Sequence, residues 1–370
     1  MIHRYCRSDL TMLLSLSINT DIHVRDKIPK YMANQKKKRT IIIGIGKQTI
    51  EDHLPALESS RNAQLIGIVD KEKSKLQHWS KKLNVPGYAS ISDAINATRP
   101  DFAIVVVPHD QYFDIIKKLV KSKIHILKEK PLALNYKEAV EIYKMTQRAN
   151  VQLMVTLQRR FNPIFSTFQQ LMHQIGKHFL VEAKYTIFVN DPSEGWRGHK
   201  SRAGGGCIID MGYHLIDLLI WYFGLPNAIY AEFSSSARPK KRYDAEDTAV
   251  ITFRYNKSGT YGSMILSRYI WPKTEYLKLI GSNGTVEVKR GSLTRTSKTG
   301  EVLEQLTREK SWTAAATQQI DYFCEMIDGK KKNIGSPKYH LQPMAFIEAC
   351  YRSQKSKTLI DPYKILGKHA

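Results

Sequence analysis

Paired cysteines, metal-binding clusters and long apolar segments are missing from this sequence. Its four cysteines form no C-x-x-C pair, which argues against a disulfide framework and a zinc ribbon. No H-E-x-x-H motif or Cys/His cluster occurs, so no metal is predicted. Near the amino terminus, the longest uncharged apolar run covers residues 10–18, whereas a membrane-spanning helix needs roughly 20. These absences predict a cytoplasmic protein without a membrane segment.

Acidic residues are scarce relative to basic ones. The chain has 57 Lys and Arg against 34 Asp and Glu, a formal net charge of +23. The basic residues are dispersed, with short runs at 36–39, 240–242 and 330–332, and no run alternates with aromatic residues as in a nucleic-acid module. We therefore expect no specific nucleic-acid partner, while the charge mildly favours an anionic small substrate.

The first 38 residues differ from the rest. Residues 10–18 look signal-like behind Arg4 and Arg7, but charged residues follow where a cleavage site would be. The segment starting at Met32 resembles a bacterial start. We expect residues 1–38 to be a basic extension that is disordered or lies upstream of the true start.

From Arg39 the chain alternates between short apolar strands and helices. The pattern predicts strands over residues 40–43, 64–69, 102–107 and 124–127, and helices over 48–57, 71–82, 111–120 and 136–148. Apolar strands that alternate with helices indicate a parallel sheet covered on both faces. Beyond residue 150, longer alternating strands separated by hairpin-like turns predict an open, predominantly antiparallel sheet with helices on one face.

A glycine turn marks the first strand as a nucleotide site. The stretch Gly44-Ile45-Gly46-Lys47-Gln48-Thr49 approaches G-x-G-x-x-G, with Thr49 in place of the third small residue. Asp70 ends the next strand about 20 residues later, where an acidic group binds a ribose hydroxyl. An aspartate repels a 2′-phosphate, so NAD is favoured, although Lys71 leaves NADP as an alternative. The competing interpretation is an ordinary tight turn, with Asp70 capping the following helix.

The apolar pattern of residues 207–223 predicts one largely buried helix. At about 100° per residue, Asp210, His214, Asp217 and Trp221 fall on one stripe. A carboxylate one turn from a histidine orients the imidazole for acid–base catalysis. Glycines 204–206 before the helix suggest close backbone approach to a bound molecule. The alternative is an Asp–His pair that only anchors the helix.

Three motifs, in order along the chain, resemble one family. They are Glu129-Lys130-Pro131, Arg159-Arg160-Phe161-Asn162-Pro163, and residues 204–217 with the pattern G-G-G…D-x-G-x-H-x-x-D. Together they resemble the glucose-fructose oxidoreductase and inositol dehydrogenase family, Gfo/Idh/MocA. The resemblance spans Arg39 to the carboxyl terminus. It implies a Rossmann-fold NAD(P)-binding domain over residues 39–150 and a substrate-binding and oligomerisation domain over 151–370.

The resemblance assigns roles to the motif residues. Lys130 and His214 would be the catalytic pair, with Asp210 as a substrate-binding or orienting carboxylate. The expected cofactor-binding residues are Gly44, Gly46, Lys47, Gln48, Asp70, Pro108, Tyr112, Glu129 and Lys130. The expected substrate-binding residues are Arg159, Arg160, Trp196, Arg197, Asp210 and His214, although one of the paired arginines is expected to brace the domain junction.

The sequence departs from the family pattern at Thr49, at Tyr112 in place of a common histidine, and at Lys128 before E-K-P. The Tyr112 departure puts nearby cofactor contacts in question.

These features predict an NAD(P)-dependent oxidoreductase acting on a hydroxyl or keto carbon of a sugar, cyclitol, sugar phosphate or nucleotide sugar. His214 would take the hydroxyl proton while Lys130 polarises the oxygen. Two alternatives stay open: a non-catalytic NAD-binding regulator, and an NAD-dependent glycosidase or lyase that uses transient redox. We also expect a homodimer or homotetramer.

Overall fold

The computed structural model describes residues 36–238, 240–307 and 312–369. Most of the expected amino-terminal extension, with Cys6, lies outside the described residues. The first strand begins at Lys38.

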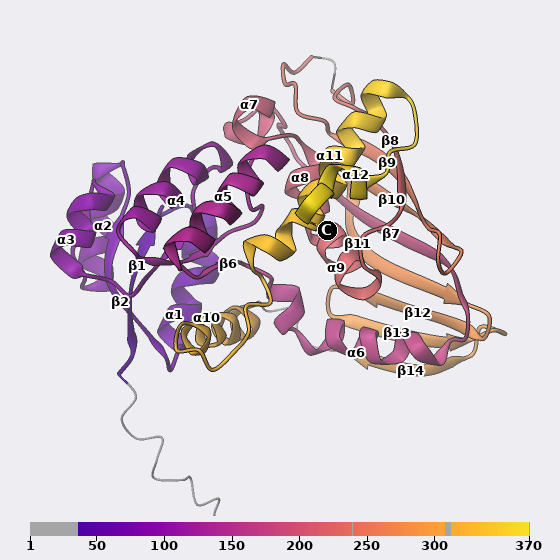
Figure 1. Ribbon diagram of the computed structural model, residues 1–370, viewed down its shortest axis with the longest axis horizontal. Coiled ribbons are helices and arrows are strands. Elements are labelled where there is room, and N and C mark those ends of the chain that lie inside the picture. The colour runs from indigo at the N-terminus through magenta and orange to yellow at the C-terminus, as the bar shows by residue number, and fades with distance from the viewer. Residues whose placement is uncertain (1–35, 239, 308–311, 370) are drawn as a thin grey trace, which may run out of the picture. The chain divides into compact units, whose positions relative to one another are not determined.

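The first sheet has six parallel strands in the order β3-β2-β1-β4-β5-β6 (Figure 1). Their bounds are β1 Lys38–Ile43, β2 Ala63–Val69, β3 Gly87–Tyr88, β4 Phe102–Val105, β5 His125–Lys128 and β6 Leu153–Val155. The connecting helices are η2 Thr49–His53 with α1 Leu54–Ser59, α2 Lys73–Leu83, α3 Ile91–Thr98, α4 Tyr112–Lys121 and α5 Tyr136–Ala149. The predicted strands and helices are present, whereas α3 and the short strands β3 and β6 were not predicted.

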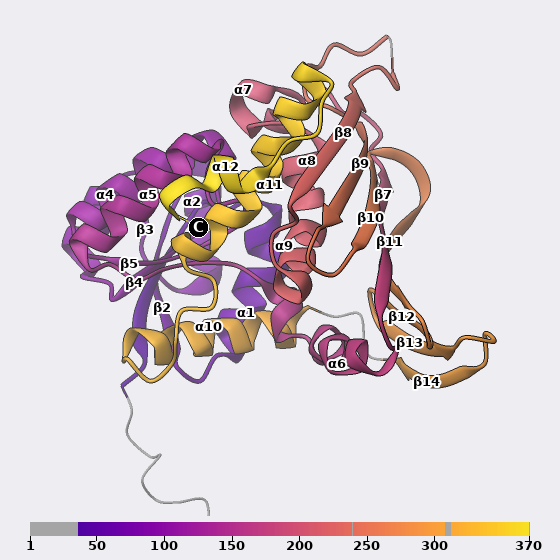
Figure 2. The same cartoon turned by 45° about the vertical axis from the view of Figure 1, so that its right-hand side comes forward.

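Both faces of this sheet are covered, which explains why its longer strands carry runs of buried apolar residues. Ile41 and Ala103 face a core shared with α4 and α5. Ile42 and Phe102 point the other way, into a core shared with α1 and with α10 (Thr313–Ile327). Figure 2 shows α10 alongside α1 although the two are far apart in sequence.

The second sheet has eight strands in the order β14-β13-β12-β11-β7-β10-β9-β8. Their bounds are β7 His178–Phe188, β8 Ala228–Ser234, β9 Thr248–Tyr255, β10 Thr260–Ser267, β11 Tyr269–Gly281, β12 Gly284–Lys289, β13 Ser292–Ser297 and β14 Val302–Thr307. Only β7 and β10 pair in parallel, so the sheet is predominantly antiparallel as predicted. The sequence did not predict β13 and β14.

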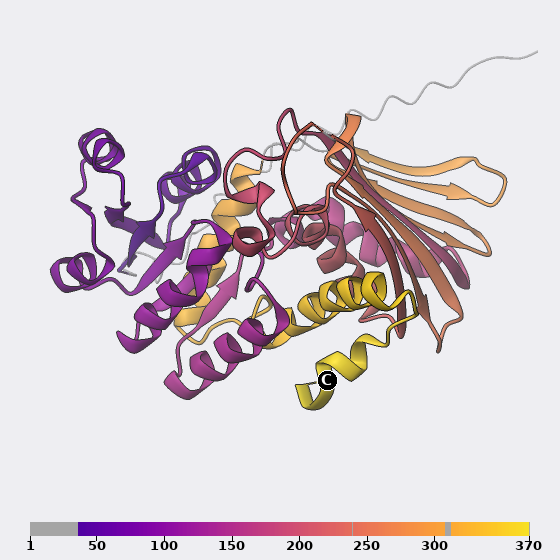
Figure 3. The same cartoon turned by 90° about the horizontal axis from the view of Figure 1, so that it is seen from above.

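Helices cover one face of the second sheet: α6 Pro163–Leu171, α9 Gly212–Phe223 and α11 Pro337–Ser356. The short helices η4 Gln158–Phe161, η6 Trp196–Gly198, α7 Lys200–Ala203 and α12 Pro362–Leu366 lie in the connections. Seen from above, no described helix lies on the opposite face of this sheet (Figure 3).

The segment 207–223 is bent, contrary to the single helix that its pattern predicted. It divides into α8 Cys207–Asp210 and α9, and the axis turns by 51° at Met211. A Cβ at Gly212 would lie 2.5 Å from Leu266 of β10, so close packing against the sheet occurs at the bend. Asp210 and His214 therefore sit on different helical arms. Within the described part of the chain, no single helix has the length and hydropathy of a membrane span; only the bent pair Lys200–Asp210 and Gly212–Phe223 passes when counted together.

The three glycines before α8 approach the protein itself, not a ligand as the sequence suggested. A Cβ at Gly204 would lie 2.4 Å from the Leu134 carbonyl oxygen, and one at Gly206 would lie 1.8 Å from that of Glu246. The Cys207 amide donates to the same Glu246 oxygen at 2.7 Å. The glycines thus let the start of α8 dock on the loop before β9.

Gly206→Ala is expected to destabilise the protein by about 1–3 kcal/mol or more, because its methyl group would overlap backbone atoms that cannot rotate away. Urea unfolding measures the change. Gly46→Ala is a comparison in which a Cβ would meet nothing within 4 Å and the backbone is not in the left-handed region. Equal stability of Gly206→Ala and the wild type would contradict this view of the glycines.

Candidate active site

A cleft of about 960 Å³ opens at the carboxyl ends of the first sheet's strands. Such a position is the usual ligand site of a doubly wound sheet. All the residues predicted to bind cofactor line it, namely Gly44, Gly46, Lys47, Gln48, Asp70, Pro108, Tyr112, Glu129 and Lys130. Trp196 and Arg197, predicted to contact substrate, line the same cleft.

The glycine turn between β1 and η2 forms the floor of this cleft. Gly44 has φ +94°, and a Cβ there would lie 2.2 Å from the Val106 carbonyl oxygen. At Gly46 a Cβ would meet nothing within 4 Å, so this backbone is open for a bound group to approach. Thr49 is accommodated because its hydroxyl donates to the Gly44 carbonyl oxygen at 2.6 Å. The residues therefore fit a dinucleotide despite the missing third glycine.

Asp70 connects the two edges of the turn and borders the cleft. Its Oδ2 accepts a hydrogen bond from the Ile45 amide at 2.7 Å, and its Oδ1 accepts one from the Glu72 amide at 3.0 Å. The carboxylate thus has a structural role while lining the cleft, but it does not cap α2, whose N-cap residue is Glu72 and which has no side-chain cap.

Two departures from the family pattern contact each other. The Nζ of Lys128, fully buried, lies 3.5 Å from the centre of the Tyr112 ring. It also donates to the carbonyl oxygen of Glu129 at 2.6 Å and to that of Pro131. Lys128 thereby fixes the backbone of the E-K-P turn through two of its carbonyl oxygens. Tyr112 is buried beside the cleft, where its ring supports this lysine.

Glu129, expected at the cofactor edge, is held by a histidine that the sequence did not reveal. Its Oε1 lies 2.9 Å from Nε2 of His53. Burial by itself would raise the pKa of Glu129, but the hydrogen bond and charge of His53, with nearby Lys130, hold that pKa below its ordinary value. Glu129 is therefore a carboxylate at neutral pH.

Lys130 and Asp210 join the two halves of the chain. The Lys130 Nζ donates to Oδ1 of Asp210 at 2.9 Å and to its backbone carbonyl oxygen at 2.8 Å. The other carboxylate oxygen accepts from Arg197 at 3.2 Å and from Arg268 at 3.0 Å. Burial would raise the pKa of Asp210, but these three cations hold it well below its usual range. The carboxylate is thus ionised and fixes the position of Lys130.

His214 projects from the first turn of α9, and its imidazole forms no hydrogen bond with any described residue. Burial lowers the pKa of its imidazole well below the ordinary value, and the charges of Arg159 and Lys130 lower it further, opposed by Asp210. The ring is therefore neutral near pH 7 and able to accept a proton. Asp210 does not orient this ring, contrary to the expectation from the helical stripe, because its oxygens bind cations and the helix bends between the two residues.

The adjacent arginines have different positions. Arg159 donates to Glu275 through Nε at 2.7 Å, and its charge reaches His214. Arg160 donates to both carboxylate oxygens of Asp217, at 2.8 and 3.1 Å, and packs on the Tyr339 ring. The side chains of Arg160 and Asp217 are each only 5% exposed. Arg160 is therefore a brace, and this differs from the expectation that it contacts substrate.

Sequence reasoning missed several residues around His214: Tyr185, Arg268, Lys273, Glu275 and Arg290. They are single residues on strands or turns of the second sheet, outside any motif. Tyr185 of β7 stands opposite Glu275 of β11 in the antiparallel register. Only that register brings them together, so no spacing along the chain could have revealed them.

His109 offers a pH test of this site. Its Nδ1 donates to the Ala203 carbonyl oxygen at 2.8 Å, and burial lowers its pKa from 6.5 to about 3. The unfolded chain binds the proton on this histidine more readily than the folded chain does. The contribution of His109 to the free energy of unfolding is therefore fully present above pH 6.5 and is lost as the pH drops below it. This histidine alone should cost about 2 kcal/mol at about pH 5. As the pH is lowered, the urea midpoint should fall less steeply in His109→Asn than in the wild type. Replacing the exposed His78 should leave this dependence of the midpoint on pH unchanged. Identical slopes in all three proteins would contradict the expectation.

A glycine turn at the first parallel strand, a cleft at the carboxyl ends of the strands, and a lysine meeting an aspartate from the second half together define a dinucleotide-binding protein of the Rossmann type. Residues 38–157 match the family model described as "Oxidoreductase family, NAD-binding Rossmann fold", and residues 168–287 match "GFO/IDH/MocA C-terminal domain". The chain belongs to the Gfo/Idh/MocA family.

Curated relatives carry dehydrogenase names. Myo-inositol 2-dehydrogenase of Thermotoga maritima is 27% identical over 66% of this chain and 73% of its own. D-glucoside 3-dehydrogenase of Escherichia coli is 21% identical over 87% of this chain and 97% of its own. A putative UDP-kanosamine synthase oxidoreductase subunit of Amycolatopsis mediterranei is 26% identical over 50% of this chain. The match spans about half of that last protein, 52%, and 60 to 67% of three further relatives.

Solved structures share the fold. The WlbA dehydrogenase from Bordetella pertussis, solved with NADH and UDP-GlcNAcA, has a TM-score of 0.76 at 22% identity, covering 88% of this chain and 99% of that one.

Proposed function

We propose that this protein transfers hydride between a nicotinamide dinucleotide and the hydroxyl or keto carbon of a carbohydrate-like substrate. Lys130 and His214 are the catalytic pair. The observation that carries the proposal is the bonding of Lys130, at the edge of the cofactor cleft, to Asp210, which lies four residues before the neutral His214 on the other side of the bend. The dehydrogenase names of the relatives support the same activity.

The residues divide the chemistry as follows. When bound, the nicotinamide supplies the hydride acceptor or donor. In the oxidative direction, neutral His214 takes the hydroxyl proton as the carbon loses hydride. Lys130 donates a hydrogen bond to the same oxygen and stabilises the charge that develops there. Asp210 holds Lys130 in place and therefore acts as a positioning residue. Its carboxylate oxygens also accept hydrogen bonds from substrate hydroxyls through any free lone pair.

The loop that contains η6 would cover the substrate. Arg197 binds Asp210 while its guanidinium stacks on Trp196, with 4.3 Å between the guanidinium carbon and the ring centre. Trp196 packs on His109, with 4.4 Å between the ring centres. We infer that Trp196 and Arg197 contact the substrate and exclude water from it.

The experiment that tests this function follows NADH formation by absorbance against sugars, cyclitols, sugar phosphates and nucleotide sugars. His214→Ala should lower kcat by about 10²- to 10⁴-fold while NAD binding persists. His78→Ala, which removes an exposed histidine of α2, is the control and should keep full activity. Binding of NAD without net reduction of any substrate would instead favour the regulator or the transient-redox enzyme.

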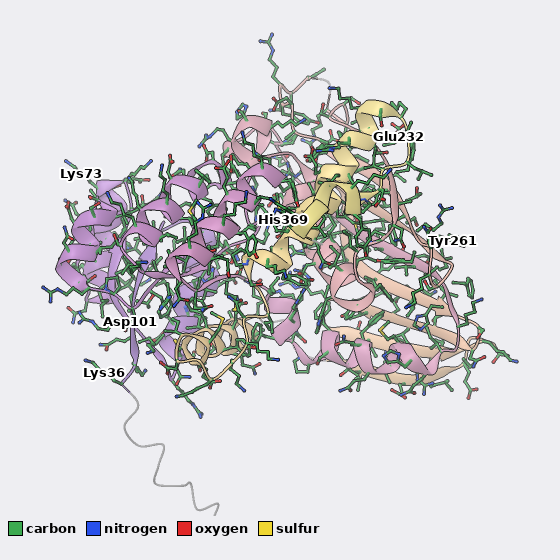
Figure 4. All side chains as sticks on the ribbon, in the orientation of Figure 1. Lys36, Lys73, Asp101, Glu232, Tyr261 and His369 are labelled. Carbon is green, nitrogen blue, oxygen red and sulfur yellow. The ribbon has the colours of Figure 1, made fainter. Side chains whose placement is uncertain are left out.

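We infer that residues 39–150 bind the cofactor and that residues 151–370 hold substrate and mediate self-association. The three described cysteines, Cys207, Cys324 and Cys350, are free and buried, which supports a reducing cytoplasm. On the uncovered face of the second sheet, exposed Val250 and Ile265 are register partners, and Tyr261 is also exposed. Figure 4 places Tyr261 on the side remote from the first sheet. These apolar side chains support a homodimer or homotetramer built on this face.

Ile265→Glu is expected to shift the protein to monomer, because a charge would be buried at the centre of that face. Sedimentation velocity measures the change at micromolar concentration. Gln77→Glu, which adds a negative charge at an exposed position of α2, is the control and should leave the sedimentation unchanged. A wild-type protein that sediments only as monomer would refute the self-association.

A further inference from the structure

Three cationic side chains from separate elements lie within electrostatic range of one another, and two of them, Arg159 and Lys273, are also within range of His214. Arg159 belongs to η4, Lys273 to β11, and Arg290 to the turn between β12 and β13. The guanidinium carbons of Arg159 and Arg290 lie 5.6 and 4.9 Å from the centre of one ring, the Trp312 indole. The Nζ of Lys273 lies 6.0 Å from the centre of the Tyr185 ring. Like charges brought this close repel one another, so the arrangement favours an anion among them.

One carboxylate neutralises part of this group: Glu275 pairs with Arg159 through Oε1, and its Oε2 is buried without a hydrogen-bond partner. Neither Arg290 nor the exposed Lys273 forms an ion pair with any described residue. The Nε of Arg290 is buried without a hydrogen-bond partner. Asp52, across the domain junction, is within electrostatic range of Arg290 without forming an ion pair with it. Buried donors are normally satisfied, so an unpaired guanidinium nitrogen indicates a missing partner.

The group faces the proposed reaction centre and not the cofactor cleft. Burial and then the charge of Arg159 lower the pKa of His214, and Lys273 acts in the same direction. Tyr185, which stands opposite Glu275 in the register of β7 and β11, is within electrostatic range of both Arg290 and Asp210. None of the three cations lines the cleft assigned to the cofactor. A cofactor pyrophosphate is therefore not the anion that they would meet.

We propose that Arg290 and Lys273 bind an anionic group of the substrate, a phosphate or a carboxylate, while its reacting carbon lies against His214. A guanidinium donates through a planar fork that matches both anions, and an ammonium adds a point charge. Arg159 is already neutralised by Glu275 and instead positions the indole that lies under Arg290. The assignment of the reacting carbon rests on the proposed function, whereas the anion site rests on its own contacts.

Equilibrium binding to the full chain saturated with NADH tests the site without turnover. Inorganic phosphate, glucose 6-phosphate, glucuronate and glucose are titrated by calorimetry. The wild type should bind the anions and bind glucose at least about tenfold more weakly, and Arg290→Gln should weaken anion binding about tenfold or more. Lys273→Gln should act in the same direction, and Arg290→Lys should retain part of the affinity. Lys289→Gln is the matched control, because it removes the neighbouring charge, which pairs with Glu287 at 2.5 Å.

Each outcome has a definite meaning. A preference for glucose 6-phosphate over glucuronate identifies a phosphate, and the reverse preference identifies a carboxylate. The proposal is overturned if no anion binds, if glucose binds as tightly as its charged relatives, or if Lys289→Gln weakens binding as much as Arg290→Gln. Circular dichroism of each variant checks that the fold is retained.

The same data separate this inference from the proposed function. Anion binding that depends on Arg290 in a protein that never reduces NAD would sink the oxidoreductase function and keep the site. Conversely, reduction of NAD by a neutral sugar at a rate unchanged in Arg290→Gln would keep the oxidoreductase and remove the anion site.

Discussion

Lys130→Ala is expected to lower kcat by about 10²- to 10⁴-fold, because its ammonium group is the donor at the oxygen of the reacting carbon. KM should change less, since Arg197 and Arg268 still hold Asp210 in place. Rates of NADH formation measure kcat once a substrate has been found.

The control for this variant is Lys137→Ala, which removes an exposed lysine of α5 and should leave kcat unchanged. NAD binding, followed by protein fluorescence, should persist in both variants. If Lys130→Ala lost NAD binding together with activity, the lysine would act on the cofactor and not on the reacting oxygen.

Arg160→Leu is expected to lower the free energy of unfolding by about 3–5 kcal/mol, because it leaves the buried carboxylate of Asp217 without its partner. Arg160 also donates to the Ile334 carbonyl oxygen at 3.3 Å and packs between the Trp221 and Tyr339 rings. This single side chain therefore links α9 to α11 and to the segment before it. Urea unfolding monitored by circular dichroism measures the loss.

A surface pair provides the comparison. Arg352 and Glu348 form an ion pair one helical turn apart on α11, with Arg352 more than half exposed. Arg352→Leu should change stability by no more than about 1 kcal/mol, since solvent screens such pairs. The double variant Arg160→Leu/Asp217→Leu should recover part of the loss, because no charge is then left unpaired. Equal effects of Arg160→Leu and Arg352→Leu would contradict the bracing role.

Local patterns were enough to predict the first sheet and the motif residues. The strands β1, β2, β4 and β5 each contain a run of buried apolar residues because both faces of the sheet are covered, so each was visible in the sequence. The glycine turn, E-K-P and the D-x-G-x-H segment are stretches of consecutive residues. Their members were therefore identified before any contact was known.

Elements with weak local patterns were missed. The strand β3 has only two residues, and β14 exposes Val302 and Leu303, which breaks the usual alternation of buried and exposed side chains. The bend at Met211 was also missed, because the apolar pattern continues across it and only Leu266 of a distant strand shows why the chain turns there.

By itself, the sequence predicted the alternation of strands and helices in the first half, the position of the cofactor turn, and the motifs that contain Lys130, Asp210 and His214. These depend on neighbours along the chain, whose spacing the backbone geometry converts directly into position. Tertiary structure alone decided which cations hold Asp210, that Arg160 is a brace, and that Arg290 and Lys273 come within electrostatic range of each other. Those contacts depend on sheet register and helix packing, which arise from the burial of many side chains together and leave no mark at any one residue.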